Sequence, residues 1–341
     1  MLAVTFQEPG RVAIEERPEP ELQAPDDAIV RVEASGICGS DLHIYHGRVP
    51  VEPGFTIGHE FAGTVEAVGD AVTQVAPGDR VLGTFHTACG TCFFCRKGEF
   101  QNCDDMRVFG HGSGSGNLQG TQAERALVPH ANLGLRRVPD GVSDAAALFA
   151  GDVMGTGYHS IVAAGTKPGD SVAVVGLGPV GLCATIAAKV AGAAHVIAID
   201  PVEERGRTAE RLGAIYLNED PRAAVKEITD GRGVDVAVDA VGHPDALDTA
   251  IRLARKGGTV SVVGVYAEHQ QVHMGLVWIK TLRFVSGRAN VIAHLDPVLA
   301  LMRGGVVDIS PLVSQELPLT DAPDAYEAYA QHSALKILLR P

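Results

Sequence analysis

The stretch Ser171-Val-Ala-Val-Val-Gly176-Leu-Gly178-Pro179-Val180-Gly181 decides the fold class of this 341-residue chain. An apolar run that fits a buried strand leads directly into glycines spaced G-x-G-x-x-G, and an apolar helix follows them. One glycine permits the tight turn, another lets a pyrophosphate approach the backbone, and the third lets helix and strand pack closely. The helix N-terminus adds N–H donors and a partial positive charge. The sequence therefore predicts a dinucleotide site formed by Gly176, Gly178, Pro179, Val180 and Gly181.

Asp200 lies nineteen residues after Gly181, where the next predicted strand ends. A carboxylate there can accept hydrogen bonds from both hydroxyls of an adenosine ribose, whereas a 2′-phosphate would meet like charge. The sequence therefore predicts NAD rather than NADP, with Arg205 as a neighbouring contact that, like Arg207, weakens this preference. The alternative is a glycine-rich turn followed by a chance Asp at a helix N-terminus.

Around this stretch, apolar runs alternate with helical segments. Strands are predicted at residues 172–175, 196–199, 234–240, 259–265 and 282–286. Runs with little polar alternation, separated by helices, are typical of a parallel sheet covered on both faces. We therefore expect an α/β fold with a doubly wound parallel sheet in the middle of the chain.

The two ends of the chain have a different pattern. The first third predicts short strands with turns between them, at residues 30–33, 61–68 and 80–83. After residue 290 we expect a helix at 292–303, a strand at 312–317, a helix at 322–331 and a strand at 334–339. About fifty residues are too few for a third domain with its own core. We therefore expect domains at 1–153 and 154–290, with residues 291–341 returning to the first domain.

Composition excludes several classes of protein. With 46% apolar and 20% charged residues, the chain is not intrinsically disordered. A net charge of −13 disfavours binding to nucleic acid or anionic membranes. The uncharged stretch 171–188 has glycines and a proline in its middle, which fits a strand and helix better than a membrane span. The start lacks a secretory leader, and the cysteines are too crowded for a disulfide framework, so we expect a cytoplasmic protein.

Four of the six cysteines fall within fifteen residues, at Cys89, Cys92, Cys95 and Cys103. Thiolates at such short spacings can close a tetrahedron around Zn²⁺ and leave no position for a substrate, which predicts a structural zinc site. An iron–sulfur cluster is the alternative, but the spacing differs from that of the ferredoxin motifs.

Two further segments carry candidate ligands. Cys38 lies in the run from Gly36 to His43, and His59 lies between Gly58 and Glu60. Taken singly, Cys38 also fits a buried structural cysteine, and His59 also fits a histidine of the core. Together with the four cysteines and the glycine motif, in this order and at these separations, they resemble the zinc-dependent medium-chain alcohol dehydrogenases over essentially the whole chain. The resemblance implies a GroES-like β domain and a Rossmann domain, with the active site in the cleft between them.

The resemblance also implies roles for individual residues. Cys38 and His59 match the first two ligands of a catalytic zinc. Asp152 matches the third ligand position. The sequence around it resembles that of the bacterial branch with an Asp ligand, which includes formaldehyde-dehydrogenase-like enzymes and secondary alcohol dehydrogenases. A thiolate and a carboxylate would neutralise Zn²⁺ and leave a fourth position for water or alcohol. Two alternatives remain: Asp152 as a helix cap, and Glu60 as a ligand, an exchanging ligand or a neighbour of the ligands, as in polyol dehydrogenases.

In the resembling enzymes, zinc acidifies the alcohol, and the positions of Ser40 and His43 carry its proton to water while hydride passes to the nicotinamide. Thr156 is expected at the nicotinamide end. We therefore expect a zinc- and NAD-dependent alcohol dehydrogenase acting on a small alcohol, aldehyde or ketone. It should be a homo-oligomer, a tetramer or a dimer, that pairs through residues 282–286. The alternatives are a zinc-free quinone or enoyl reductase of the same fold and a non-catalytic nucleotide-binding protein.

Overall fold

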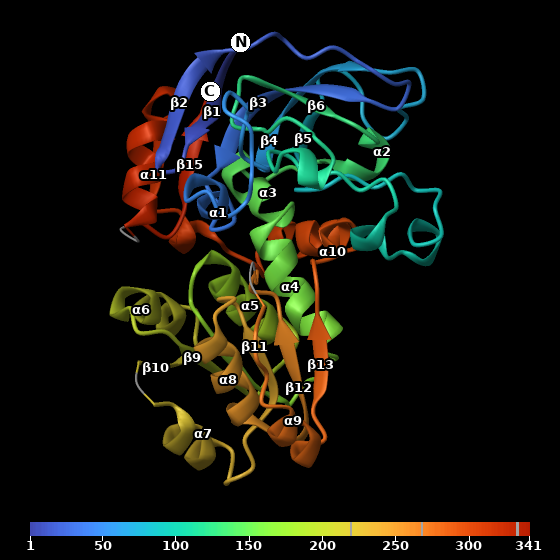
Figure 1. The fold of residues 1–341 in the computed structure, drawn as a ribbon. Coiled ribbons are helices and arrows are strands. Elements are labelled where there is room, and N and C mark those ends of the chain that lie inside the picture. The colour runs from blue at the N-terminus through green and yellow to red at the C-terminus, as the bar shows by residue number, and fades with distance from the viewer. Residues whose placement is uncertain (219, 267–268, 332–333) are drawn as a thin grey trace. The chain divides into compact units, whose positions relative to one another are not determined.

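The computed structural model describes residues 1–218, 220–266, 269–331 and 334–341. They form two units (Figure 1). The first unit comprises Met1–Asp152 and Asn290–Pro341, and the second comprises Val153–Ala289. In the described ranges, none of the helices combines the length and the apolar character that crossing a membrane requires.

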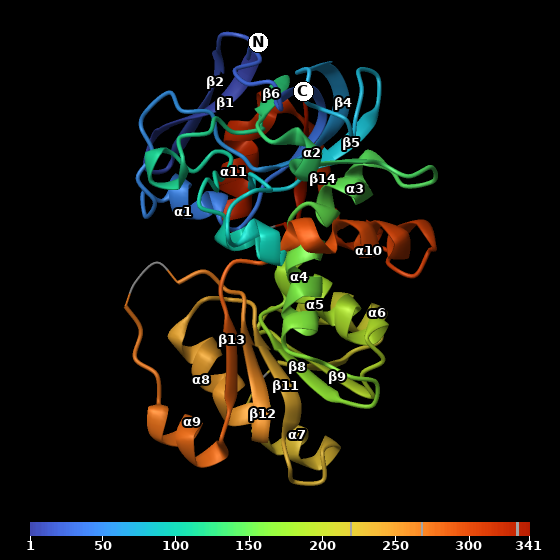
Figure 2. The same cartoon turned by 90° about the vertical axis from the view of Figure 1, so that its right-hand side faces the viewer.

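The second unit is built on one parallel sheet of six strands (Figure 2). The strands are β8 (Ser171–Val175), β9 (His195–Ile199), β10 (Ile215–Leu217), β11 (Val234–Asp239), β12 (Ala254–Val262) and β13 (Arg283–Ser286). Their spatial order is β10-β9-β8-β11-β12-β13, and every neighbouring pair is parallel. The order reverses at β8, which is the arrangement of a doubly wound dinucleotide-binding fold. The predicted α/β fold with a doubly wound sheet is confirmed.

Helix α4 (Val153–Ala163) precedes the first strand of this sheet. The helices that connect the strands are α5 (Pro179–Val190), α6 (Glu203–Arg211), α7 (Arg222–Ile228), α8 (Pro244–Leu253) and α9 (Met274–Lys280). All five residues of β8 are buried, which explains why this strand shows no polar alternation. Helix α4 packs closely on α5 at Gly157. A Cβ atom at this position would lie 2.5 Å from the backbone nitrogen of Ala184, so only glycine allows the approach.

The first unit contains a hairpin and a larger, mostly antiparallel sheet. The hairpin pairs β1 (Leu2–Glu8) with β2 (Arg11–Glu16). The sheet contains β3 (Ala28–Gly36), β4 (Glu60–Val68), β5 (Arg80–Gly83), β6 (Arg125–Val128), β7 (Leu135–Arg137), β14 (Gln315–Pro318) and β15 (Ile337–Arg340). Strand β15 pairs with β3, and Leu338 lies opposite Gly36. The last segment of the chain therefore lies beside the end of β3, where candidate metal ligands begin.

Short helices fill the rest of the first unit. They are α1 (Asp41–Tyr45), α2 (Ala131–Gly134), α3 (Asp144–Ala150), α10 (Val291–Arg303) and α11 (Ala322–Ala330), with 3₁₀ turns η1 (Cys95–Lys97), η2 (Phe100–Asn102), η3 (Ser113–Ser115), η4 (Ser310–Leu312) and η5 (Leu319–Asp321). Tyr45 of α1 stacks on Tyr326 of α11, with ring centroids 5.6 Å apart. The buried ring of Tyr326 thus supports the helix that follows Cys38.

Four predicted strands have boundaries that differ from the structure by two or more residues, and the one predicted at 30–33 spans Ala28–Gly36. The strand predicted at 312–317 begins only at Gln315, because Pro311 lies in the 3₁₀ turn η4. The strand predicted at 259–265 spans Ala254–Val262 instead. It ends there because the backbone N–H groups of Val263 and Gly264 both donate to the carbonyl of Asp239. The strand predicted at 334–339 begins at Ile337; residue 333 and the one before it lie outside the described residues.

Candidate active site

Four potential metal ligands, from three segments that are far apart in sequence, meet in the first unit. Cys38 lies between β3 and α1, His59 and Glu60 lie at the start of β4, and Asp152 follows α3. One donor atom of each lies within 4.8 Å of the others, and all four residues are buried. The structure therefore brings together every residue that the sequence analysis considered for the catalytic metal.

The imidazole of His59 is held by a carboxylate on one side and faces the ligand cluster on the other. Nδ1 lies 3.0 Å from Oδ1 of Asp41, while Nε2 lies 3.1 Å from Oδ2 of Asp152 and 3.2 Å from Oγ of Ser40. With the proton on Nδ1, beside Asp41, the lone pair of Nε2 faces another acceptor, the Asp152 carboxylate. A cation between Nε2 and this carboxylate would relieve the conflict, as in carboxylate–histidine–zinc sites.

Charge is crowded in this cluster. Burial, together with the charges of Asp152 and Glu60, raises the pKa of the Cys38 thiol. Burial also raises the pKa of Glu60 to about 7, although Lys336 opposes the shift. Burial opposes ionisation of Asp152, but its contacts with His59 and Glu60 and the charge of Lys336 together lower the pKa of this carboxyl. Sulfur, imidazole nitrogen and carboxylate oxygen donors suit Zn²⁺, so the residues present fit a catalytic zinc.

Ser40 and His43 are placed by the start of α1. Ser40 precedes the helix, and His43 lies one turn later, so both residues share one side of it. Nδ1 of His43 is buried and has no hydrogen-bond partner among the described residues. Burial, helped by the charges of Arg48 and His46, lowers the pKa of His43. His43 is therefore a neutral imidazole with a free position, which suits a proton carrier.

Sequence reasoning missed three neighbours of the cluster. Asp41 also accepts a hydrogen bond from the backbone N–H of Cys38 at 2.9 Å, so it orients two candidate ligands at once. The ring of His111 lies edge-on to that of His59, with centroids 5.1 Å apart. Lys336, at the start of the last strand, makes a buried ion pair with Glu60. For Asp41 the available signal was its place three residues after Cys38.

The glycine motif of the second unit forms the turn between β8 and α5. Gly176 has φ of 90°, which favours glycine. A Cβ atom at Gly181 would lie 1.8 Å from the carbonyl oxygen of Gly176, whereas one at Gly178 would meet nothing within 4 Å. Gly178 is the N-cap of α5, and Pro179 and Val180 begin the helix. The turn thus leaves open space beside the N-terminus of a twelve-residue helix, where phosphates bind well.

Asp200 follows β9 and points at the glycine turn. Its Oδ2 accepts a hydrogen bond from the backbone N–H of Leu177 at 2.7 Å, and Oδ1 accepts one from that of Val202 at 2.8 Å. Each oxygen retains a lone pair for a further donor. Nη1 of Arg205, on α6, lies 3.7 Å from Oδ2 of Asp200, and Thr156 lies on α4.

Cys89, Cys92, Cys95 and Cys103 form a second group whose sulfur atoms lie within 4.8 Å of one another. Backbone N–H groups point at the sulfurs, including that of Cys89 to the Sγ of Cys103 at 3.2 Å. Burial opposes ionisation of Cys89, but donors of Thr91 lower the pKa of this thiol to about 6. Four clustered sulfurs with such donors fit a closed tetrahedral zinc site.

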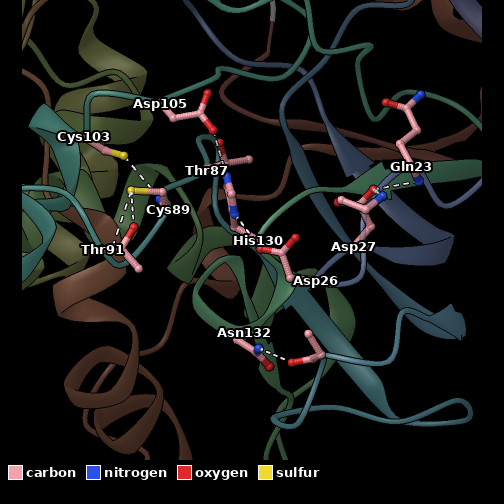
Figure 3. A network of polar contacts seen from close by, with 12 residues as sticks. Gln23, Asp26, Asp27, Thr87, Cys89, Thr91, Cys103, Asp105, His130 and Asn132 are labelled. Atoms are coloured by element: carbon pink, nitrogen blue, oxygen red, sulfur yellow. Dashed lines mark hydrogen bonds and ion pairs between the residues drawn. The ribbon is translucent and has the colours of Figure 1, made fainter.

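Next to this lobe, residues 89–103, a histidine connects the segment that directly follows it to the rest of the first unit (Figure 3). Nδ1 of His130 lies 2.7 Å from Oδ2 of Asp26, and Nε2 lies 3.0 Å from Oδ2 of Asp105. Burial opposes charge on the ring, but the hydrogen bonds to Asp105 and Asp26 raise the pKa of His130. On another side of the lobe, Nδ2 of Asn290 donates to the carbonyl of Gly98 at 2.6 Å.

The chain is similar to known proteins over its whole length. The family profile described as "Alcohol dehydrogenase GroES-like domain" matches residues 24–140, and the one described as "Zinc-binding dehydrogenase" matches residues 179–302. The zinc-type alcohol dehydrogenase-like protein AdhB of Bacillus subtilis (strain 168) is 35% identical, and the alignment covers 100% of both chains.

Solved structures agree with this similarity. Alcohol dehydrogenase TADH from Thermus sp. ATN1 has a TM-score of 0.96 and 46% identity, covering 100% of this chain and 99% of its own. A protein of Sinorhizobium meliloti 1021 described as a zinc-binding dehydrogenase, and bound to NADP, has a TM-score of 0.87 and 31% identity, covering 100% and 99%.

Proposed function

The chain belongs to the zinc-dependent alcohol dehydrogenases of the medium-chain family, which use zinc and NAD(P), and from that premise we propose the residues that perform the reaction. Cys38, His59 and Asp152 hold the catalytic zinc, and the glycine turn after β8 binds NAD. The observation that carries this proposal is the meeting of these three side chains, from separate parts of the sequence, within 4.8 Å.

When bound, zinc supplies a Lewis acid that lowers the pKa of an alcohol hydroxyl. Ser40 accepts the hydroxyl proton, because its Oγ lies 3.2 Å from the nitrogen of His59 that faces the ligands. Ser40 releases its own proton as it accepts this one, the nicotinamide ribose of the bound cofactor would link Ser40 to His43, and His43 passes the proton to water. The neutral ring of His43 and its buried Nδ1, which has no hydrogen-bond partner among the described residues, support this role. When bound, NAD would supply the acceptor for the hydride that the alcohol carbon loses, with a carbonyl compound and NADH as products, and Thr156 is proposed to contact the nicotinamide end of the cofactor.

We propose NAD as the preferred cofactor. Asp200 supports this preference, since its fixed carboxylate can bind ribose hydroxyls and would repel a 2′-phosphate. Arg205 is a further cofactor contact that moderates the repulsion. Comparison of kcat/KM for NAD and NADP tests the assignment, and a preference for NADP would overturn it.

The four-cysteine lobe is proposed to hold a second, structural zinc, and the protein is proposed to be a homotetramer, or else a dimer, in the cytoplasm. None of the six cysteines, all within the described ranges, forms a disulfide, which suits a reducing compartment. Trp278 of α9 is 81% exposed, and β13 ends the strand order of the sheet. Exposed apolar side chains and an open sheet edge are both suited to pairing between subunits. A monomer in light scattering would contradict this assembly.

Two ligand variants test the catalytic site. Cys38→Ser and His59→Ala should abolish alcohol oxidation and lower the zinc content from two per chain to one, while NAD still binds. Cys183→Ala, inside α5, is the matched control that should keep both zincs. Unchanged rates in the ligand variants would refute the assignment, and a zinc-free wild type that reduces quinones or enones would favour the reductase alternative. A panel of short secondary, polyol and aromatic alcohols, with formaldehyde in the reverse direction, then identifies the substrate.

A further inference from the structure

Lys336 is a fully buried lysine whose ammonium group is directed at a candidate metal ligand. It lies immediately before β15, and neither Lys336 nor Glu60 exposes its side chain to solvent. Nζ of Lys336 donates to Oε1 of Glu60 at 2.5 Å and also contacts Oε2. A buried charge persists only when a partner compensates for the lost hydration, so these two groups hold each other in the charged state.

Residues packed around the Lys336–Glu60 pair restrict the position of the Glu60 carboxylate. A Cβ atom at Gly36, the last residue of β3, would lie 2.1 Å from Oε2 of Glu60 and 3.0 Å from Cε of Lys336. Only glycine at this place leaves room for the pair. The ring of Phe149 lies below the ammonium, with its centroid 5.7 Å from Nζ.

Glu60 is the next residue after His59, and its carboxylate oxygen lies within 4.8 Å of the other donor atoms. It can therefore reach a metal held there unless something restrains it. The charges of Cys38 and Asp152 already balance a divalent ion, and Lys336 balances Glu60. With Glu60 on the lysine, the metal site and the ion pair are each locally neutral, whereas Glu60 on the metal would be a third anionic ligand and would leave a buried ammonium without its partner.

We propose that Lys336 is a positioning residue that holds the Glu60 carboxylate off the catalytic zinc and so keeps the fourth coordination position open for the alcohol. This inference rests on the proposed function, because it requires a metal bound by Cys38, His59 and Asp152. It also decides between the two candidate carboxylates: Asp152 is the ligand in the resting enzyme, and Glu60 is kept in reserve.

The test replaces the catalytic zinc with Co²⁺, whose visible absorption reports coordination number. Lys336→Met removes the ammonium at similar chain length, so Glu60 is expected to bind the metal. The intense bands of four-coordinate Co²⁺ should weaken toward a five-coordinate spectrum, and the metal should leave about tenfold more slowly to a chelator. The double variant Lys336→Met/Glu60→Gln removes both charges and should restore the four-coordinate spectrum. It also keeps the test usable if the single variant does not fold.

Gly36→Ala gives an independent route to the same state, since the new methyl group displaces the carboxylate while Lys336 is retained. It should cause the same spectral change. Lys280→Met is the control: this lysine of the second unit binds backbone carbonyls of Ile251, Arg252 and Ala254, and its loss should leave the spectrum unchanged.

The outcomes separate the two levels of the argument. If Co²⁺ binds but the spectra of Lys336→Met and Gly36→Ala match that of the wild type, the positioning role is wrong and the metal site stands. A double variant that keeps the altered spectrum also overturns the role, because Glu60 would not be the added ligand. If Co²⁺ does not bind at the Cys38 cluster at all, the proposed function itself fails.

Discussion

Replacing Asp41 with asparagine would disturb the way in which two metal ligands are held. One carboxylate oxygen of Asp41 accepts the backbone N–H of Cys38 at 2.9 Å, and the other lies 3.0 Å from Nδ1 of His59. Asparagine has only one acceptor oxygen. If that oxygen faces Cys38, the amide donates to Nδ1 and the imidazole proton moves to Nε2, which then has no lone pair for a metal. If the amide is flipped, its NH₂ opposes the N–H of Cys38.

Either arrangement loses one buried hydrogen bond to a charged group, a cost of about 1.5–3 kcal/mol. This corresponds to a loss of roughly 10- to 100-fold in zinc affinity or in kcat/KM, as is typical for groups that support metal ligands. The same cost should leave the lobe zinc unaffected, because its proposed ligands are the four cysteines rather than the residues that Asp41 contacts. In a titration with chelator, Asp41→Asn should therefore lose one zinc per chain much earlier than the wild type and retain the other.

The matched control is Asp144→Asn, which changes an acid in the first turn of α3 whose partner is the half-exposed Arg80. Surface pairs of this kind contribute about 0–1 kcal/mol, so both zincs should be retained as in the wild type. Circular dichroism confirms that each variant is folded. A folded Asp41→Asn variant with an unchanged chelator curve and unchanged kcat/KM would show that Asp41 does not hold the ligands.

Three other changes test separate parts of the structure. His130→Asn keeps the left-handed backbone but removes an imidazolium between two carboxylates that raise its pKa. That stabilisation is complete below the pKa of histidine in the unfolded chain and is lost as pH rises through the pKa of His130 in the folded protein. The Tm of the variant should therefore be about 2–4 °C lower than that of the wild type at mildly acid pH, and the difference should shrink at alkaline pH. A Tm difference that does not change with pH would contradict this. Cys92→Ser should reduce two zincs per chain to one and speed proteolysis within the lobe, whereas Cys183→Ala should do neither; retention of both metals in Cys92→Ser would exclude the lobe as a zinc site. Gly181→Ala should lower the stability of the second unit by about 1–3 kcal/mol through overpacking, while Gly178→Ala should keep the Tm and weaken NAD binding; equal melting temperatures would argue against this packing role.

Much of the second unit could be predicted because its signals are local. The apolar run before Gly176 and the glycine spacing specify strand, turn and helix within eleven residues, and the same alternation then repeats along the sheet. Strand ends were less predictable. Residues after Val262 are apolar and read as strand, but their N–H groups are taken by the carbonyl of Asp239 on a neighbouring strand. Such a bond depends on the tertiary fold, so a residue pattern does not contain it.

The metal cluster also contains residues with a local sequence signal and a residue that only the tertiary fold brings to the site. Cys38, His59 and Asp152 were found through motifs, although 93 residues separate His59 from Asp152. Lys336 was not found, because 276 residues separate it from Glu60 and only the pairing of β15 with β3 brings them together. Its one local signal was a charged side chain within the apolar stretch 334–339, where a lysine needs a buried partner.

Anomalous diffraction at the zinc edge, from crystals of the zinc-loaded protein, tests the central claim most directly. The account predicts two zinc peaks per chain. One should lie about 2.0–2.3 Å from Sγ of Cys38, Nε2 of His59 and a carboxylate oxygen of Asp152, and the other should lie among the four sulfurs of the lobe. A fully loaded crystal with no peak bonded to Cys38, His59 and Asp152 would contradict it.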